Sequence, residues 1–467
     1  MTASQWERNL PRRALSVVGL MVVIAAVSQL LVAARPKPAA PPPPIAIPGA
    51  EAPAVGALDG DNATTPMSAA DLGRIQADIA FWSARLKQRP TDFVSAEKWG
   101  ETEMELARAT GDLTAYLRAG AAFDQALRLY PDMALARGLK GAVLVSLHRF
   151  DDAAGLARIT LAETPNDPTA LATLGDASLE LGDVTAARNA YERLASSAPS
   201  AAADARLSHL AFITGDTAGA IRLARAAVAA SNEEEAAGER ASFYRYQLAE
   251  TLIGTGDRAG AEAVYRDALT SDPGSFLAHA GLAHALAAGG DLNGAIRELS
   301  AAIAIVPLPE SLARRGDLYA LRAAPGDAAR ATKDYDLVAF EAAFAGEAAY
   351  VYDRTLVLYL ANHRAEPDRA VALATAELAI RKDAYGYDAL AWAQLAAGRA
   401  AEADATMASA LAFGTRDARL EYHVGMIALA LGQNDRARTS LESALALDPG
   451  FDPLQAARAR QALADLP

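Results

Sequence analysis

The chain has 467 residues, of which 52% are hydrophobic and 22% are charged, so its composition is that of a folded protein rather than a disordered one. Aromatic residues make up 6% and cysteine is absent, which favours helices over strands and excludes disulfides, thiolate metal sites and a cysteine nucleophile. The net charge is −13, to which residues 1–37 contribute +4 and residues 38–467 contribute −17. A folded part this acidic repels polyanions, so we do not expect nucleic-acid binding.

A long apolar stretch follows a short N-terminal segment, residues 1–13. Residues 14–34, ALSVVGLMVVIAAVSQLLVAA, contain no charged side chain, and a helix of this length covers about 30 Å of bilayer hydrocarbon. We predict a single transmembrane anchor here. A cleaved signal peptide, with small residues at 32–34 as the cleavage site, is the alternative, although signal peptides usually have an apolar part of only about 7 to 15 residues.

The charges that flank this stretch predict its orientation. Arg8, Arg12 and Arg13 precede it and only Arg35 and Lys37 follow it, which favours an N-terminus inside the cell. The preference for alanine and for arginine over lysine suggests a bacterium with a GC-rich genome. We therefore expect a single-pass protein of the bacterial inner membrane with its bulk on the periplasmic side; a cytoplasmic array is a further alternative.

Residues 35–67 contain too many prolines for a helix and too few large apolar residues for a core, so we predict a Pro/Ala-rich disordered linker. Residues 68–90 then place Ile75, Ile79 and Trp82 at helical spacing after Ser68 and Asp71, whose spacing is that of a capping box. We predict a capping helix over this range.

A sequence period of 34 residues begins after it. Prolines recur at positions 131, 165 and 199 and again at 273 and 307, and the segments 182–199 and 256–273 share the order Gly-Asp, Ala, Tyr and Pro. This period and this order of residues resemble the tetratricopeptide repeat, and the whole chain resembles a membrane-anchored bacterial member of that family. The resemblance implies an all-α fold, an α-solenoid of about ten helical hairpins over residues 91–449. Residues 450–467 are predicted to close it as a C-terminal capping helix.

Each residue of the motif has a structural role in the hairpin. Gly175 is small enough for close approach of a partner helix, and Tyr191 lies on the inward stripe of the following helix. Gly182 is suited to the left-handed conformation that ends the first helix, and Asp183 to capping the next. Pro199 then prevents continuation.

Some units depart from the pattern. His148 stands where the turn usually has glycine, and the repeat register is loosest at 310–382. Residues 231–240, SNEEEAAGER, lie where about seven residues have been inserted. We expect a lengthened hairpin with a solvated face there, the alternative being an acidic contact site.

No motif in the sequence predicts catalysis. A phosphate-binding glycine loop, H-E-x-x-H and G-x-S-x-G are all missing, so we predict neither an enzyme nor a cofactor or metal site. His279 and His284 are five residues apart, a poor geometry for sharing a metal, and we expect ordinary packing or surface residues. Tyr335 stands at the inward aromatic position, so its neighbours Asp334 and Asp336 are expected to be solvated carboxylates rather than catalytic groups.

The family resemblance also implies that the first helices of the repeats line a concave groove that binds partners. Carrying the groove positions of the repeat onto this chain gives Asp176, Leu179, Glu180, His209, Phe212, Phe243, Tyr246, Glu250, His284, Asp317, Tyr352, Tyr359, His363, Asp388 and Trp392. This set lacks the Lys, Arg and Asn with which some members bind a terminal carboxylate. Trp392 has an alternative role, packing between helices as part of the core.

These features together predict a membrane-tethered scaffold or adaptor that binds protein partners and helps to assemble or organise a cell-envelope complex. The alternative function is a recognition or sensor subunit that binds a non-protein ligand, such as a glycan, or a peptide, for an envelope enzyme system.

Overall fold

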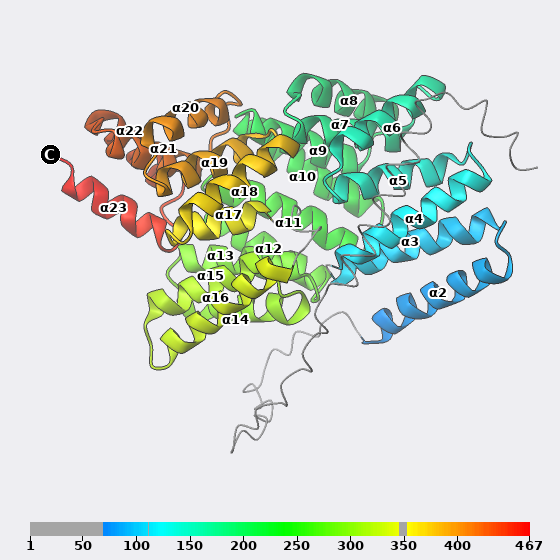
Figure 1. Ribbon diagram of the computed structural model, residues 1–467, viewed down its shortest axis with the longest axis horizontal. Coiled ribbons are helices and arrows are strands. Elements are labelled where there is room, and N and C mark those ends of the chain that lie inside the picture. The colour runs from blue at the N-terminus through cyan, green and yellow to red at the C-terminus, as the bar shows by residue number, and fades with distance from the viewer. Residues whose placement is uncertain (1–68, 111, 345–352) are drawn as a thin grey trace, which may run out of the picture. The chain divides into compact units, whose positions relative to one another are not determined.

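The computed structural model describes residues 69–110, 112–344 and 353–467. The predicted N-terminal segment, anchor and linker therefore lie outside the described residues, as does Ser68 of the predicted capping box. The described part is all-α, with 22 helices labelled α2 to α23 (Figure 1). None of these helices combines the length and apolar character needed to cross a membrane.

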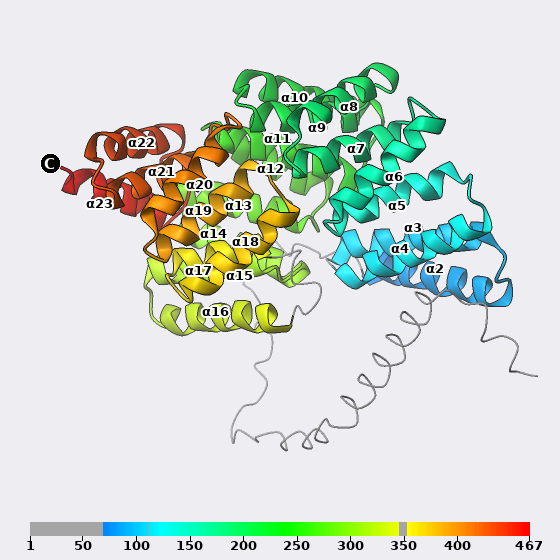
Figure 2. The same cartoon turned by 45° about the horizontal axis from the view of Figure 1, so that its top comes forward.

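Twenty of these helices form ten consecutive hairpins, the number that the 34-residue period predicts. The pairs are α3 (Phe93–Thr110) with α4 (Leu113–Leu129), α5 (Ala134–Ser146) with α6 (Phe150–Glu163), α7 (Pro168–Glu180) with α8 (Val184–Ser197), α9 (Ala201–Ile213) with α10 (Thr217–Glu233), α11 (Gly238–Gly254) with α12 (Arg258–Ser271), α13 (Phe276–Ala288) with α14 (Leu292–Ile305), α15 (Pro309–Arg322) with α16 (Asp327–Phe344), α17 (Asp353–Asn362) with α18 (Pro367–Ile380), α19 (Ala384–Ala396) with α20 (Ala400–Leu411), and α21 (Ala418–Ala430) with α22 (Asn434–Leu447). Figure 2 shows the first hairpins stacked in chain order.

One further helix packs at each end of this array. Helix α2 (Ala69–Gln88) buries Ile75 and lies against α3, where Arg74 donates to Glu105 across 2.5 Å. Helix α23 (Gln455–Asp465) buries Ala459 in a cluster with Tyr422 and Leu441. Both helices cover apolar faces that a terminal hairpin would otherwise expose, as expected for caps.

The glycine and tyrosine of the motif form the contact between the two helices of a hairpin. The ring of Tyr191 is 2% exposed and lies so close to Gly175 that a Cβ atom at that position would overlap it. The same contact within a hairpin joins Gly316 of α15 to Tyr335 of α16, whereas Gly281 of α13 packs in a similar way against the fully buried Tyr265 of the preceding hairpin. Any larger residue at the glycine would push the helices apart.

The predicted turns are also confirmed. Gly182 has φ +83°, in the left-handed region, and Asp183 Oδ1 accepts the backbone N–H of Ala186 at 2.9 Å. His148 adopts φ +53° at its turn, a conformation that is strained for a residue with a side chain. The insertion at 231–240 lengthens α10 and α11 to 17 residues each, and most of its residues are exposed.

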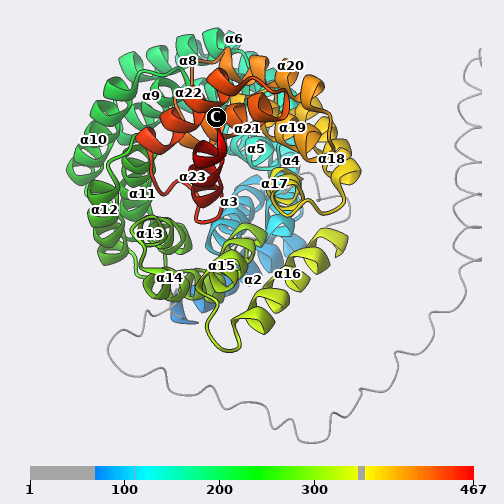
Figure 3. The ribbon, with the colours of Figure 1, turned by 90° about the vertical axis from the view of Figure 1, so that its left-hand side faces the viewer.

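The array winds back onto itself after six repeats. The backbone N–H of Lys382, just before α19, donates to the carbonyl of Glu180 at 2.8 Å, and the hydroxyl of Thr415, just before α21, donates to the carbonyl of Ile213 at 2.6 Å. Figure 3 shows the helices following one another round a ring, with α19 to α22 returning to the side where α6 to α9 lie. We call this line of contacts the seam. It joins the first turn of the superhelix, to which α6 to α15 belong, to the second turn, to which α19 to α22 and residues 448–451 belong.

Close packing along the seam requires small residues. A Cβ atom on Gly215 would overlap the carbonyl oxygen of Gly414, and one on Gly450 would lie 2.5 Å from Ala288. Arg381 adds an ion pair to Glu180, with 2.6 Å between Nε and Oε2. The two turns are therefore in direct backbone contact, rather than separated by an open groove.

One sequence expectation about this part of the fold is wrong. Asp334 is 2% exposed instead of solvated, because both of its oxygens accept hydrogen bonds from the guanidinium of Arg315 at 2.7 and 2.8 Å. Asp336 is exposed, and Tyr335 takes the inward position against Gly316, as expected.

Candidate functional site: a cavity between the superhelical turns

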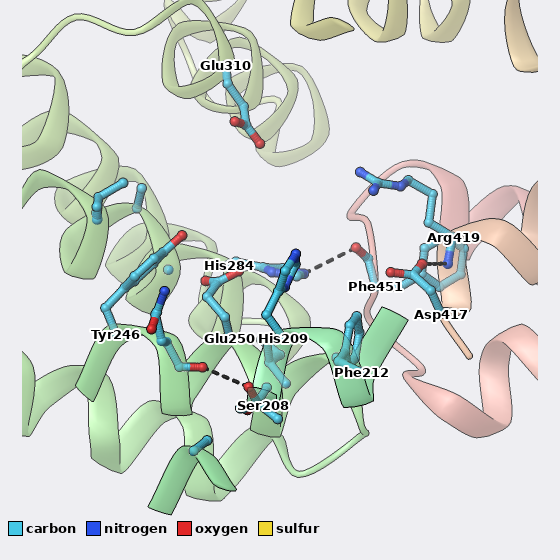
Figure 4. Close-up of a pocket in the computed structure, with 18 of the residues that line it drawn as sticks. Ser208, His209, Phe212, Tyr246, Glu250, His284, Glu310, Asp417, Arg419 and Phe451 are labelled. Carbon is cyan, nitrogen blue, oxygen red and sulfur yellow. Dashed lines mark hydrogen bonds between the residues drawn. The ribbon is translucent and has the colours of Figure 1, made fainter. Parts of the chain in front are cut away.

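The two turns enclose a cavity of about 530 Å³. Its walls come from α9, α11, α13 and α15 of the first turn and from α19, α21 and residues 448–451 of the second turn (Figure 4). The first helices of the repeats therefore face inward, as the sequence predicts, but the second turn covers part of the surface that was expected to be an open groove.

Five predicted groove residues from three successive repeats line this cavity. His209 and Phe212 come from α9, Tyr246 and Glu250 from α11, and His284 from α13. His209, Tyr246 and His284 lie at equivalent positions of stacked first helices, with Phe212 and Glu250 one turn further along, so the repeat geometry brings the five together.

Enclosure by the surrounding protein changes the ionisation of these side chains. It lowers the pKa of His284 to about 3 and also lowers the pKa of His209, so both imidazoles are neutral near pH 7. His284 Nε2 lies 3.1 Å from the carbonyl oxygen of Phe451 and therefore carries the hydrogen that this bond needs. Burial raises the pKa of Glu250, whose Oε1 accepts the hydroxyl of Tyr265 at 2.5 Å.

The sequence analysis missed the other charged residues of the cavity, four of which lie on α15 or at the start of α21. Glu310 and Arg314 lie on α15 and are joined by an ion pair of 2.8 Å. Asp417 and Arg419 lie at the start of α21, where Asp417 accepts the backbone N–H of Arg419 and the hydroxyl of Tyr385. These four residues do not occupy groove positions of the repeat motif. They line the cavity only because the second turn returns to the first.

Several other predicted groove residues instead stabilise the wall of the superhelix. Asp176 accepts hydrogen bonds from Arg206 and from the hydroxyl of Tyr191, at 2.8 and 2.9 Å. Glu180 lies at the seam, and Leu179 is 5% exposed within the core. Phe243 is 39% exposed on α11 and is not among the residues that line the cavity.

A second group of predicted residues forms a cluster between α15 and α17. His363 Nε2 lies 3.1 Å from Asp317 Oδ1, which also accepts the hydroxyl of Tyr335 at 2.8 Å. The rings of Tyr359 and His363 are 4.7 Å apart. Tyr352 lies outside the described residues.

The last two predicted residues require a correction, because they are buried rather than exposed in a groove. Trp392 is 7% exposed and stacks on His423, with ring centroids 4.0 Å apart. Asp388 is 1% exposed and lies 2.6 Å from His423 Nδ1. The helix of the next repeat, α21, supplies the covering His423, so Trp392 packs between helices. One edge of it also borders a separate hollow of about 410 Å³ beside His363.

The side chains of the cavity resemble those of a binding pocket. Among the helices that the structure describes, no three His, Asp or Glu side chains come together as a metal site. The cavity instead combines aromatic rings with a few charged groups, the composition typical of binding pockets.

Comparisons with known proteins agree with the repeat pattern. Models of the tetratricopeptide repeat match residues 104–168, 173–235, 245–315 and 418–451. No curated protein matches the chain.

Many solved structures are similar to the chain, and three of them show how little sequence they share with it. The human IFIT1 dimer with PPP-AAAA is 12% identical over 81% of this chain and 89% of that one, with a TM-score of 0.46. The P58(IPK) TPR domain is 13% identical over 85% and 95%, with a TM-score of 0.27. The APC/C hetero-tetramer Cut9-Hcn1 is 13% identical over 85% and 94%, with a TM-score of 0.31.

Proposed function

We propose that this chain, which is built of tetratricopeptide repeats, is a membrane-tethered scaffold that binds protein partners and helps to assemble or organise a cell-envelope complex. Tetratricopeptide repeats generally act as protein-interaction scaffolds. The observation that carries the proposal is the convergence of groove residues from α9, α11 and α13 on one cavity. The tether rests on residues 14–34 and on the arginines that precede them.

The size of the cavity limits what part of a partner enters it. A volume of about 530 Å³ is too small for a folded domain, so the proposed contact is a short extended segment of the partner. Phe212 and Tyr246 supply rings on the cavity wall, and buried aromatic anchors commonly contribute most to the binding energy of an interface.

Site-specific photocrosslinking in living cells tests this proposal. A crosslinking residue at Tyr246 or His284 is expected to capture a defined partner from the membrane fraction. The matched control is Ile159, which is 59% exposed on α6 and does not line the cavity. Equal capture from Ile159, or no capture from the cavity positions, would contradict binding in the cavity.

Reporter fusions after Pro467 test the proposed topology. A periplasm-active phosphatase is expected to be active and a cytoplasm-active fluorescent protein dark, because the charge bias favours an N-terminus inside the cell. A bright fluorescent fusion without phosphatase activity would refute the periplasmic location.

The enclosure of the cavity supports a second candidate function, recognition of a non-protein ligand. Its volume lies within the range of about 300 to 1,000 Å³ found for small-molecule sites. Saturable binding of a small ligand by the purified chain, in the absence of any partner, distinguishes this function from the scaffold.

A further inference from the structure

We infer that the cavity is an oxyanion-binding site, in which the guanidinium groups of Arg419 and Arg314 hold the carboxylate or phosphate of a small ligand that also carries a ring. This inference rests on the second candidate function and names the chemistry of its ligand. Arg314 comes from α15 and Arg419 from α21, so the ligand would contact both turns of the superhelix.

Arg419 is the first reason for expecting an anion. The structure gives its guanidinium no hydrogen bond: its Nε is buried without a partner, and the nearest carboxylate oxygen, Asp388 Oδ2, is 4.0 Å from it. That carboxylate is already engaged by His423 at 2.6 Å. The guanidinium lies 5.2 Å from the centre of the Tyr385 ring, and Figure 4 shows it pointing into the space between the walls. The side chain is 34% exposed, with only its Nε buried, and a partly enclosed cation with unused donors favours an anionic partner.

Arg314 adds a second cation to the same space. It pairs with Glu310, which raises the pKa of the guanidinium, while Arg419 acts in the opposite direction. Arg419 lowers the pKa of Arg314 because the two positive charges repel each other across the cavity. An anion between them would relieve that repulsion, and 41% of the Arg314 side chain is exposed, so its remaining donors are accessible.

Acidic groups act on Arg419 through space: burial lowers its pKa, but the charges of Asp417 and Asp388 outweigh that and raise it. None of these carboxylates accepts a hydrogen bond from its guanidinium, so its donors remain unused. Asp417 accepts two backbone N–H groups of α21 and the hydroxyl of Tyr385. Asp448 accepts the backbone N–H of Gly450 at 2.8 Å, and burial raises its pKa. Burial also raises the pKa of Glu250, whose Oε1 accepts the hydroxyl of Tyr265.

The walls beside the arginines favour a ring on the ligand. Phe212 on α9, Tyr385 on α19 and Phe451 in the segment before α23 all line the cavity. A guanidinium forms two parallel hydrogen bonds with a carboxylate or a phosphate, and aromatic walls then bury the attached ring. The ligand class is therefore an aromatic or cyclic acid.

Calorimetry on the purified full-length chain in an uncharged detergent tests this inference. The probes are phenylacetate, phenyl phosphate and the neutral phenylacetamide, at low ionic strength. We expect saturable binding of at least one acid, at least tenfold tighter than binding of the amide; whichever acid binds more tightly identifies the natural oxyanion. Arg419→Gln is expected to weaken that binding at least tenfold, and Arg419→Lys, which keeps the charge but loses the planar fork, to weaken it less.

Arg266→Gln is the matched control, because Arg266 is 56% exposed on α12 and pairs only with Glu262. It should leave binding unchanged. Circular dichroism checks that each variant folds. If Arg419→Gln does not fold, Arg314→Gln takes its place and is expected to weaken binding of the acid in the same way.

Three outcomes would overturn the inference: neither acid binds, the amide binds as well as the acids, or the folded arginine variant binds normally. If all three probes bind equally, the cavity is a ligand site without anion selectivity, so the second candidate function survives and only the inference fails. Capture of a protein partner by crosslinking is independent of all these results.

Discussion

Replacement of Trp392 by alanine gives a direct test of the packing in the second turn. The indole is 7% exposed, stacks on His423 and lies 5.6 Å from the Tyr422 ring. Its Nε1–H donates to Asn362 Oδ1 at 2.8 Å, which links α19 to the end of α17. Truncating a buried tryptophan costs about 3 to 5 kcal/mol, and the lost hydrogen bond contributes about 1 kcal/mol of this range.

We therefore expect Trp392→Ala to reduce the free energy of unfolding of the C-terminal repeats by about 3 to 5 kcal/mol. Because repeat arrays lose stability locally, hydrogen exchange measured by mass spectrometry is the appropriate assay alongside urea denaturation. Exchange should accelerate in α17, α19 and α21, whose side chains contact the indole, and remain unchanged in α3 and α4.

The control is Phe81→Ala, since Phe81 is 56% exposed on α2 and should change stability by at most about 0.5 kcal/mol. Normal stability and exchange in Trp392→Ala would refute the packing described for this residue. If such a variant also lost partner capture, the original assignment of Trp392 to a recognition groove would be restored.

The carboxyl of Glu97 on α3 is 1% exposed, and burial, followed by the influence of Glu101, holds its pKa at about 7. Because the folded pKa is above the unfolded value of about 4.5, stability should fall as pH rises from 4.5 to 7, and Glu97→Gln should remove this fall and gain up to about 3 kcal/mol at pH 8. Urea denaturation at pH 5 and pH 8 measures the effect, and an unchanged pH dependence in the variant would contradict it. Gly175→Ala should lose about 1 to 3 kcal/mol because its Cβ overlaps Tyr191, whereas Gly73→Ala, with open space on α2, should gain up to about 1 kcal/mol. Thermal melts compare the two glycine variants, and a stable Gly175→Ala would disprove the close contact.

The sequence determined the local architecture because its signals act within one hairpin. Gly182 and Asp183 specify a turn and a cap through backbone conformation and a single short hydrogen bond. Gly175 and Tyr191 lie only 16 positions apart and meet inside the same hairpin. Repetition of these signals every 34 residues was enough to predict about ten hairpins, and the family resemblance that it carries implied the inward direction of the first helices.

Part of the cavity lining could also be predicted from the sequence. His209, Tyr246 and His284 occupy equivalent positions of consecutive repeats, so stacking neighbours necessarily places them on one wall. Trp392 occupies a similar position, but His423 from the next repeat lies over it, and the motif has no position that specifies such a contact.

Only the tertiary structure decided which residues complete the site. Arg314 and Arg419 share the cavity because the array returns to its own first turn, as do Glu180 and Arg381 at the seam. That return depends on the small rotation between successive repeats, which accumulates over six of them. A slight change in each rotation would leave every local motif intact and still separate the two turns, so no pattern within one repeat reveals their contact.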